Sequence, residues 1–195
     1  MERFRAELRA FVDGIYEGEK KVLVFGEGSR GARVALVGEA PGEQETLQGR
    51  PFVGKAGKNL DEFLELAALD RAALYVTNTV KFRPTKISPA GRVVNRPPTQ
   101  EEVRLFLPWL MRELEMVSPE VVVTLGNVPL KALTDRRQVI GSLHGQFMDL
   151  NGRLLFPMYH PASVIYNPSL KEVYRRDLLV FAQWYKKIRS FAHKT

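Results

Sequence analysis

Apolar residues recur along the chain at helical spacing in some segments and in short continuous runs in others. At the start, Phe4, Leu8, Phe11 and Ile15 follow one another at steps of three or four residues, which predicts an amphipathic helix. Similar spacing predicts helices at about 60–68, 128–133 and 167–188. A Thr at position 99 and a Glu at position 102 predict a capping box that starts another helix, running to about residue 116.

Runs rich in β-branched and aromatic residues separate these helices and predict strands. A Gly-rich segment, 26–31, is expected to form a hairpin turn between the first two runs. Strands that alternate with helices favour a mainly parallel sheet covered on both faces. We therefore predict an α/β fold with three α/β/α layers around a mainly parallel, four-stranded sheet, in one domain spanning residues 1–195. The predicted runs are Lys21–Phe25, Arg33–Gly38, Tyr75–Val80, Val121–Gly126 and Leu154–Tyr159.

Composition excludes several classes of protein. The chain is 45% hydrophobic and 26% charged, as folded domains are, which argues against disorder. Its apolar runs are far shorter than the roughly 20 residues that cross a bilayer, and its first residues lack the apolar centre of a secretory signal. We expect a cytoplasmic protein that does not contact membranes. The absence of cysteine excludes disulfides, thiolate nucleophiles and cysteine-bound metal clusters.

Positive charge is concentrated in one segment. The net charge of +7 favours a polyanionic partner such as nucleic acid, although it also serves solubility. The segment 81–100 contains Lys81, Arg83, Lys86 and Arg92, has no acidic residue and is rich in Pro. This pattern predicts an exposed basic loop.

Candidate ligand-binding residues follow the predicted strands at the edge where ligands of parallel sheets gather. Asn78 is an amide in a buried strand, so either a turn or a ligand must satisfy its hydrogen bonds. His160 ends the last strand and is restrained by Pro161, a position that suits either a structural or a functional imidazole. Phe52 lies in a Gly-rich loop and either fills the core or offers a stacking platform for a base.

Two other signals are weaker. The segment 26–31 has the spacing of a dinucleotide fingerprint, but a strand follows it where the fingerprint requires a helix. The histidines, His144, His160 and His193, are too scattered for a metal site, and we interpret His144 and His193 as surface or loop residues. We expect neither a nucleotide cofactor nor a metal.

Five motifs together resemble the family 4 uracil-DNA glycosylases. They are Gly38-Glu39-Ala40-Pro41-Gly42-Glu43-Gln44-Glu45, the 49–57 loop, Thr77-Asn78-Thr79-Val80-Lys81, Asn95-Arg96-Pro97-Pro98-Thr99 and His160-Pro161-Ala162. The resemblance covers about residues 24–178. It implies a glycosylase that flips uracil out of DNA and hydrolyses the bond between the base and deoxyribose.

The resemblance also implies roles for individual residues. Asn78 is expected to read the uracil edge, Phe52 to stack on the ring, and Gly42 to line the base pocket. The backbone amides of Glu39 and Ala40, with the imidazole of His160, are expected to stabilise the negative charge on uracil O2.

Ala40 stands where several related families place a water-activating Asp, so a strong general base is missing there. Glu39 or Glu45 is expected to orient the water. For Glu45 we favour a second role, as a pocket wall that supports Phe52 and crowds the methyl group of thymine.

The chain departs from the family at its iron–sulfur site. Family 4 enzymes hold a [4Fe–4S] cluster on four cysteines, and the equivalent positions here are Phe11, Gly14, Phe82 and Phe106. We predict that no cluster forms and that the three aromatic rings make a hydrophobic plug between the first helix, the basic loop and the later helix.

DNA binding is assigned to two surfaces. Lys81, Arg83, Lys86 and Arg92 of the basic loop are expected to bind phosphates, and this loop exceeds the family's by the segment 88–94. Beyond His160, the turn Ser163-Val164-Ile165-Tyr166 is the second surface, with Val164 or Ile165 filling the gap left by the flipped base.

We expect a monomer that acts on single- or double-stranded uracil-containing DNA. Two alternatives remain: a glycosylase for hypoxanthine or xanthine, or a weakly catalytic module that only binds uracil-containing or single-stranded DNA.

Overall fold

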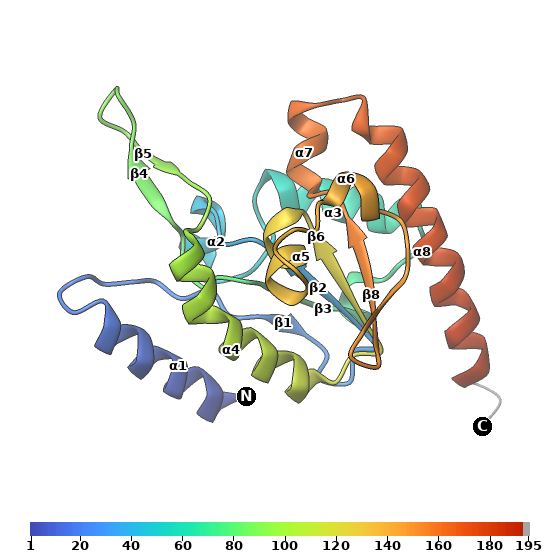
Figure 1. Ribbon diagram of the computed structural model, residues 1–195, viewed down its shortest axis with the longest axis horizontal. Coiled ribbons are helices and arrows are strands. Elements are labelled where there is room, and N and C mark those ends of the chain that lie inside the picture. Colours follow the sequence, from blue (N-terminus) through green and yellow to red (C-terminus); the bar gives the residue numbers. More distant parts are fainter. Residues whose placement is uncertain (193–195) are drawn as a thin grey trace.

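The computed structural model describes residues 1–192, so His193 lies outside the described part. Helices and strands alternate along it (Figure 1). The helices are α1 (Glu2–Ile15), α2 (Glu43–Gln48), α3 (Lys55–Leu66), α4 (Gln100–Val117), α5 (Asn127–Leu133), α6 (Ile140–Leu143), α7 (Pro161–Tyr166) and α8 (Leu170–Ala192), with one 3-10 turn at Arg71–Ala73. The strands are β1 (Glu27–Gly28), β2 (Val34–Gly38), β3 (Tyr75–Asn78), β4 (Thr85–Ile87), β5 (Val93–Asn95), β6 (Val121–Leu125), β7 (Met148–Leu150) and β8 (Arg153–Met158).

The main sheet has six strands in the order β1-β3-β2-β6-β8-β7. Its four central strands are parallel, as predicted, and β1 and β7 add short antiparallel edges. The prediction of four strands was therefore too low, because two- and three-residue edge strands leave no periodic signal. The predicted strand Lys21–Phe25 is not a strand in the structure, so the segment 26–31 does not form the expected hairpin turn. Its residues Glu27 and Gly28 pair with β3 instead.

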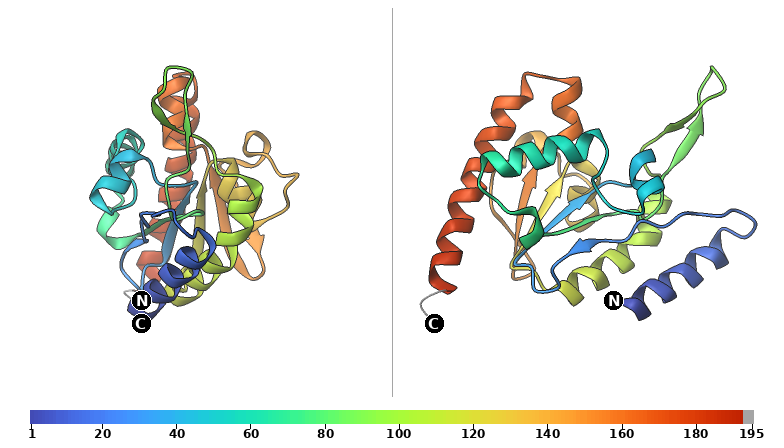
Figure 2. Two further views of the ribbon diagram at one scale, coloured as in Figure 1. Left: turned by 90° about the vertical axis from the view of Figure 1, so that its left-hand side faces the viewer. Right: turned by 180° about the vertical axis from the view of Figure 1, so that it is seen from behind.

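Alternate side chains of the central strands face two separate cores, which confirms the three layers. On one face, Leu36, Val123 and Phe156 pack against α3 and α8. On the other, Val37 and Val122 pack against α4, α5 and α6. Figure 2 shows α3 and α4 on opposite sides of the sheet.

The capping box predicted for α4 is present. The Thr99 hydroxyl accepts a hydrogen bond from the Glu102 amide at 3.1 Å, and the Glu102 carboxylate accepts one from the Thr99 amide at 2.6 Å. The helix starts at Gln100 because this exchange satisfies two amides that have no partner inside the helix.

The basic segment 81–100 is more ordered than the predicted loop. Its middle part is a two-stranded ribbon, β4 and β5, which extends away from the body at the carboxyl ends of the parallel strands (Figure 1). Helix α7 lies at the same end of the molecule.

His144 lies in the turn after α6, as the interpretation of a surface or loop residue allowed, but it also has a structural partner. Its Nδ1 lies 2.6 Å from the Asp177 carboxylate, and the two side chains connect the end of α6 to α8. No group of three potential metal-binding side chains occurs in residues 1–192. Nor does any helix in this range combine the length and apolar character that a membrane span requires.

Candidate active site

A pocket of about 540 Å³ opens at the carboxyl ends of the parallel strands, and the three side chains on which the prediction depends all line it. Asn78 ends β3, Phe52 lies in the loop before α3, and His160 follows β8. In sequence these residues are far apart, but the parallel strands bring them to one edge. The lining residues are Ala40, Gly42, Glu43, Gln44, Glu45, Phe52, Gly54, Lys55, Ala56, Asn78, Asn95, His160, Ala162, Ile165 and Tyr166.

The Asn78 side chain is only 3% exposed, yet its amide makes no hydrogen bond among the described residues. The amide is not among the fully enclosed polar groups that lack a partner, so its polar atoms open onto the pocket and remain available to a ligand. Register places Asn78 directly opposite Gly38 of β2. The amide therefore faces the pocket with one donor and one acceptor available.

Phe52 is held against the pocket wall by backbone constraints. Its φ of 53° is left-handed, which is rare for a bulky residue. Arg71 donates hydrogen bonds to the carbonyls of Pro51 and Phe52, at 2.9 and 3.2 Å. A Cβ at Gly57 would lie 1.9 Å from the Phe52 carbonyl oxygen, so only glycine fits there.

Position 38 also requires glycine, because a side chain there would collide with its neighbours. A Cβ on this glycine would come within 2.5 Å of both the Phe52 ring and the Asn78 amide oxygen. The absence of a side chain at Gly38 therefore lets the ring and the amide approach each other across the pocket floor.

His160 is a neutral hydrogen-bond donor. The Ala162 amide donates to Nδ1 at 3.1 Å, which leaves the proton on Nε2. Burial lowers the pKa of His160 to about 4, and the Glu45 carboxylate opposes this shift only in part. The imidazole ring stacks on Phe52 with 5.9 Å between ring centroids. A neutral Nε2–H thus borders the same space as Asn78.

Glu45 connects α2 to the pocket loop through hydrogen bonds. Its carboxylate accepts hydrogen bonds from the amides of Val53 and Gly54 at 3.0 and 2.7 Å, and from the Gly42 amide at 3.1 Å. These bonds connect α2 to the loop that presents Phe52. Both carboxylate oxygens are occupied, which favours the structural role of Glu45 over water activation.

Ala40 lines the pocket, whereas Glu39 does not. Among the described residues the Ala40 amide donates no hydrogen bond, so it is free to bind an anion. The Glu39 carbonyl accepts from the Val80 amide at 3.0 Å, which fixes the backbone here. Burial raises the pKa of the Glu39 carboxyl.

The prediction that Lys81 binds DNA is wrong. Its side chain is fully buried and forms an ion pair with Glu113 of α4. The ammonium also donates to the Thr77 hydroxyl and to the Asn78 carbonyl, both at 2.7 Å. Burial lowers the pKa of Lys81, and the ion pair opposes this shift. The sequence suggested a loop residue, but the chain passes under α4 before the ribbon begins, so Lys81 anchors the end of β3.

We expect Lys81→Met to lower the free energy of unfolding by roughly 3–5 kcal/mol, because it leaves the Glu113 charge buried without its partner. Urea unfolding monitored by circular dichroism measures this change. The double variant Lys81→Met/Glu113→Gln should recover part of the loss. Lys86→Met, on the exposed ribbon, should change stability by less than about 0.5 kcal/mol. Equal effects at the two lysines would contradict the buried ion pair.

The remaining predicted DNA contacts differ in exposure. Lys86 and Arg92 are exposed on the ribbon, whereas Arg83 is mostly covered and binds Asn95 and Glu43. On α7, Ser163 is half-buried and Ile165 is 43% exposed. Val164 is a core residue at 8% exposure, so it cannot fill a gap in DNA, and Ile165 is the candidate that remains.

Tyr166 and Asn95 are among the lining residues for which no role in the base pocket was expected. Tyr166 is 87% exposed at the end of α7, and Asn95 ends β5. Asn95 belongs to one of the motifs quoted above, and Tyr166 belongs to the turn after His160. Both signals were therefore present, but the place of each side chain depends on the ribbon and on α7.

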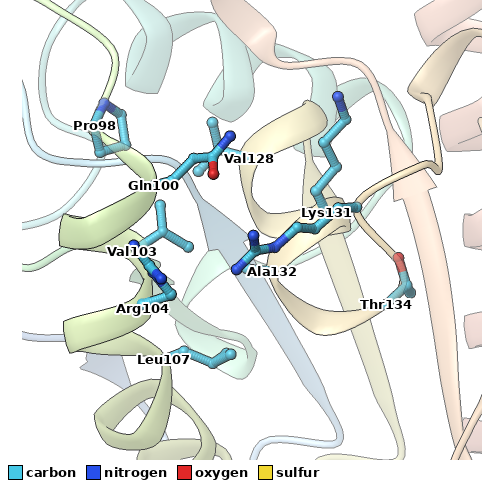
Figure 3. A pocket seen from close by; sticks show the side chains of 10 residues that line it. Pro98, Gln100, Val103, Arg104, Leu107, Val128, Lys131, Ala132 and Thr134 are labelled. Atoms are coloured by element: carbon cyan, nitrogen blue, oxygen red, sulfur yellow. The ribbon is translucent and has the colours of Figure 1, made fainter.

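A second hollow lies between α4 and α5 (Figure 3). Its floor is apolar, with Val103, Leu107 and Val128, and Arg104 and Lys131 stand at its rim. It contains none of the predicted site residues, and it lies on the side of the sheet that α4 and α5 cover. The site is therefore the pocket at the strand ends.

The positions that the resemblance makes equivalent to the family's cysteines lie in and around an aromatic core. Phe82 and Phe106 are buried with ring centroids 5.6 Å apart, and Phe11 packs on Trp109 at 5.2 Å. This core joins α1, the segment after β3 and α4. Gly14 does not take part, since no atom lies within 4 Å of where its Cβ would be. With no thiolate in the chain and packed rings at three positions, these residues do not fit a [4Fe–4S] cluster.

An unpaired amide, an aromatic ring and a neutral imidazole around one slot at the strand ends define a protein that binds a single flipped base. Comparisons agree. The family model for the uracil DNA glycosylase superfamily matches residues 25–184. The chain therefore belongs to the uracil-DNA glycosylase superfamily.

Curated relatives narrow the comparison. The chain is 36% identical to a type-4 uracil-DNA glycosylase of Saccharolobus solfataricus over 81% of this chain and 74% of the relative. It is 35% identical to the Thermotoga maritima type-4 enzyme over 88% and 84% of the two chains, respectively. The type-4 enzyme of Archaeoglobus fulgidus is 38% identical over 81% of this chain and 79% of its own.

Proposed function

We infer that this chain is a uracil-DNA glycosylase, which hydrolyses the N-glycosidic bond between uracil and deoxyribose and leaves an abasic site. The observation that supports this most directly is the buried, unpartnered Asn78 amide, which shares one pocket with Phe52 and His160. Family membership and the type-4 relatives support the same activity.

In the proposed complex, Asn78 distinguishes uracil from cytosine. Its amide oxygen accepts from uracil N3–H, and its amide nitrogen donates to O4. Cytosine presents the reverse pattern, an acceptor at N3 and a donor at N4, so both contacts would be repulsive. Phe52 stacks on the ring and holds it in the plane of the amide.

Catalysis rests on stabilising the leaving uracil anion. As the C1′–N1 bond breaks, its electron pair moves into the base and negative charge develops on O2. The Nε2–H of His160 and the Ala40 amide donate to this oxygen, and each preorganised donor is worth about 3 kcal/mol in the transition state. Because the imidazole is neutral before the reaction, it stabilises the anion without first forming an ion pair with the substrate.

A water molecule then adds to C1′ of the sugar cation and loses a proton to solvent or to a nearby carboxylate. The cation is a strong electrophile, so a positioned water suffices without a strong base. Glu39 and Glu45 are both candidates to orient this water: Glu45 lines the pocket but is held by backbone amides, whereas Glu39 lies outside the pocket lining.

We also propose that the chain needs no cofactor and works as a monomeric single domain in the cytoplasm on single- or double-stranded DNA. The aromatic core around Phe82 and Phe106 supports the first point, because it supplies by burial the contacts between α1 and α4 that a cluster would otherwise make.

Excision assays on oligonucleotides test the proposal. Single- and double-stranded DNA containing one uracil, hypoxanthine or xanthine is incubated with the purified chain, and abasic sites are cleaved with alkali. We expect excision of uracil in preference to the two purines, with no added metal and with EDTA present. Binding without cleavage of any substrate would contradict the proposed function and favour a binding module. Preferred cleavage of hypoxanthine or xanthine would reassign the base.

A further inference from the structure

The β4–β5 ribbon is anchored at its base and free at its tip. At the base, Arg96 donates to the Thr85 carbonyl at 3.0 Å and pairs with Glu102 of α4. Arg83 donates to the Asn95 side chain at 2.6 Å. An isolated two-stranded ribbon is only marginally stable in water, so these contacts hold it in place. The tip projects past the body of the protein (Figures 1 and 2).

Two apolar side chains near the tip lack a partner in the fold. Ile87 is 67% exposed and Val93 is 55% exposed, and the two residues are directly opposite each other across the ribbon. Cross-strand partners point to the same side of a sheet, so they form one apolar pair. Such a pair adds only about 0.2–1 kcal/mol to the ribbon, and more than half of each side chain stays in water, where another molecule can cover it.

The alternation of side chains shows which way this pair faces. Thr85 and Asn95 form the pair two residues closer to the base, and residues two apart in a strand share a face. Asn95 lines the base pocket. Ile87 and Val93 therefore stand on the pocket-facing side of the ribbon, about 7 Å beyond Asn95 along the strand.

The positive charge of the ribbon indicates which kind of molecule the apolar pair contacts. The segment 81–100 has no acidic residue, and Lys86 and Arg92 make no ion pair among the described residues. Free cations beside an apolar pair suit a nucleic-acid strand, which offers phosphates to the first and base faces to the second. Across the pocket, Ile165 and Tyr166 of α7 are exposed on the other side of the same opening.

We propose that the Ile87–Val93 pair packs against the bases next to the flipped uridine, so that the ribbon and α7 clamp the DNA strand from the two sides of the pocket. Lys86 pairs with Val94, so by the same alternation it points to the other face of the ribbon, and Lys86 and Arg92 attract the DNA phosphates by their positive charge. This inference rests on the proposed function and adds to it a second apolar contact with DNA, besides the one expected at Ile165.

The test compares the double variant Ile87→Ser/Val93→Ser with a matched control, Leu66→Ser/Leu179→Ser, whose leucines are 59% and 45% exposed on α3 and α8. Single-turnover excision is measured on duplex DNA and on a single strand in which abasic tetrahydrofuran residues flank the uridine, so that no base lies next to it. The fluorescence of 2-aminopurine placed beside a non-cleavable 2′-fluoro-deoxyuridine reports unstacking.

We expect the ribbon variant to lose about tenfold or more in duplex excision and to give a smaller fluorescence rise, because the bases beside the flipped nucleotide lose their apolar contact. The ribbon variant should cleave the strand without flanking bases at the rate of the unmodified protein, and the control variant should match that protein on both substrates. Val93→Thr, which keeps the β-branched shape, provides a variant with an unperturbed ribbon if the double change alters folding, and should show a smaller loss in the same direction.

The two proposals fail differently. If the unmodified protein does not excise uracil, the proposed function is wrong. If it does, and the ribbon variants match it in both duplex excision and fluorescence, the apolar pair does not contact DNA and the ribbon proposal is overturned.

Discussion

Asn78→Asp is expected to reduce single-turnover excision of uracil by roughly 10²–10⁴-fold, because a site built to hydrogen-bond a substrate rejects a mismatched edge by factors of this order. The substitution replaces the amide nitrogen, which donates to O4, by an oxygen. An ionised carboxylate would then face O4 with a lone pair. A protonated one would reverse the donor and acceptor pattern toward that of cytosine.

The measurement is the excision rate with enzyme in excess on a uracil-containing oligonucleotide. Asn151→Asp, the same chemical change in the turn between β7 and β8, is the control and should leave the rate unchanged. Because the side chains have nearly the same shape, both variants should fold. An unaltered rate for Asn78→Asp would discard the assignment of this residue to the uracil edge.

His160→Leu is expected to remove about 3 kcal/mol of transition-state stabilisation, because it removes one donor to uracil O2. The excision rate should therefore fall roughly 10²-fold. His160→Gln retains an N–H group and should recover part of the rate. The Leu variant also loses the side-chain acceptor for the Ala162 amide, so thermal unfolding of both variants should accompany the kinetics.

The pH dependence distinguishes a neutral imidazole from a charged one. Burial holds the pKa of His160 at about 4, below its ordinary value of 6.5. The ring is therefore already neutral at pH 6–8, and titration of His160 should leave the excision rate constant across this range. Protonation as the pH approaches 4 should reduce the rate, since it removes the acceptor for the Ala162 amide. An inflection near pH 6.5 that His160→Leu abolishes would show that the charged form is the active one.

The same shift has a consequence for stability, and its sign follows from proton binding. Between about pH 6.5 and 4 the unfolded chain protonates His160 while the folded chain does not. The unfolded state then binds more protons, so the contribution of His160 to stability falls as the pH falls through this window.

Local patterns were enough to predict the central strands, the large helices and the capping box at Thr99, because each depends on residues close in sequence. The edge strands, the short helices α2, α6 and α7 and the β4–β5 ribbon escaped prediction, because segments of two to six residues contain too few positions to establish a period. Lys81 illustrates the limit. Nothing in its neighbours shows that Glu113, 32 residues away, supplies the buried partner charge.

The sequence by itself determined the chemistry available to this protein: an amide at 78, an aromatic ring at 52, an imidazole at 160 and no thiolate anywhere. The tertiary structure decided which of these groups meet, since the parallel sheet brings the ends of β3 and β8 to the edge where the loop with Phe52 lies, and a bare Gly38 lets the ring and the amide close on one slot. It also decided which charges are free, because burial under α4 withdraws Lys81 from solvent whereas the ribbon leaves Lys86 and Arg92 exposed. Composition cannot separate these cases, because the partner of a side chain depends on distances that the chain acquires only when it folds.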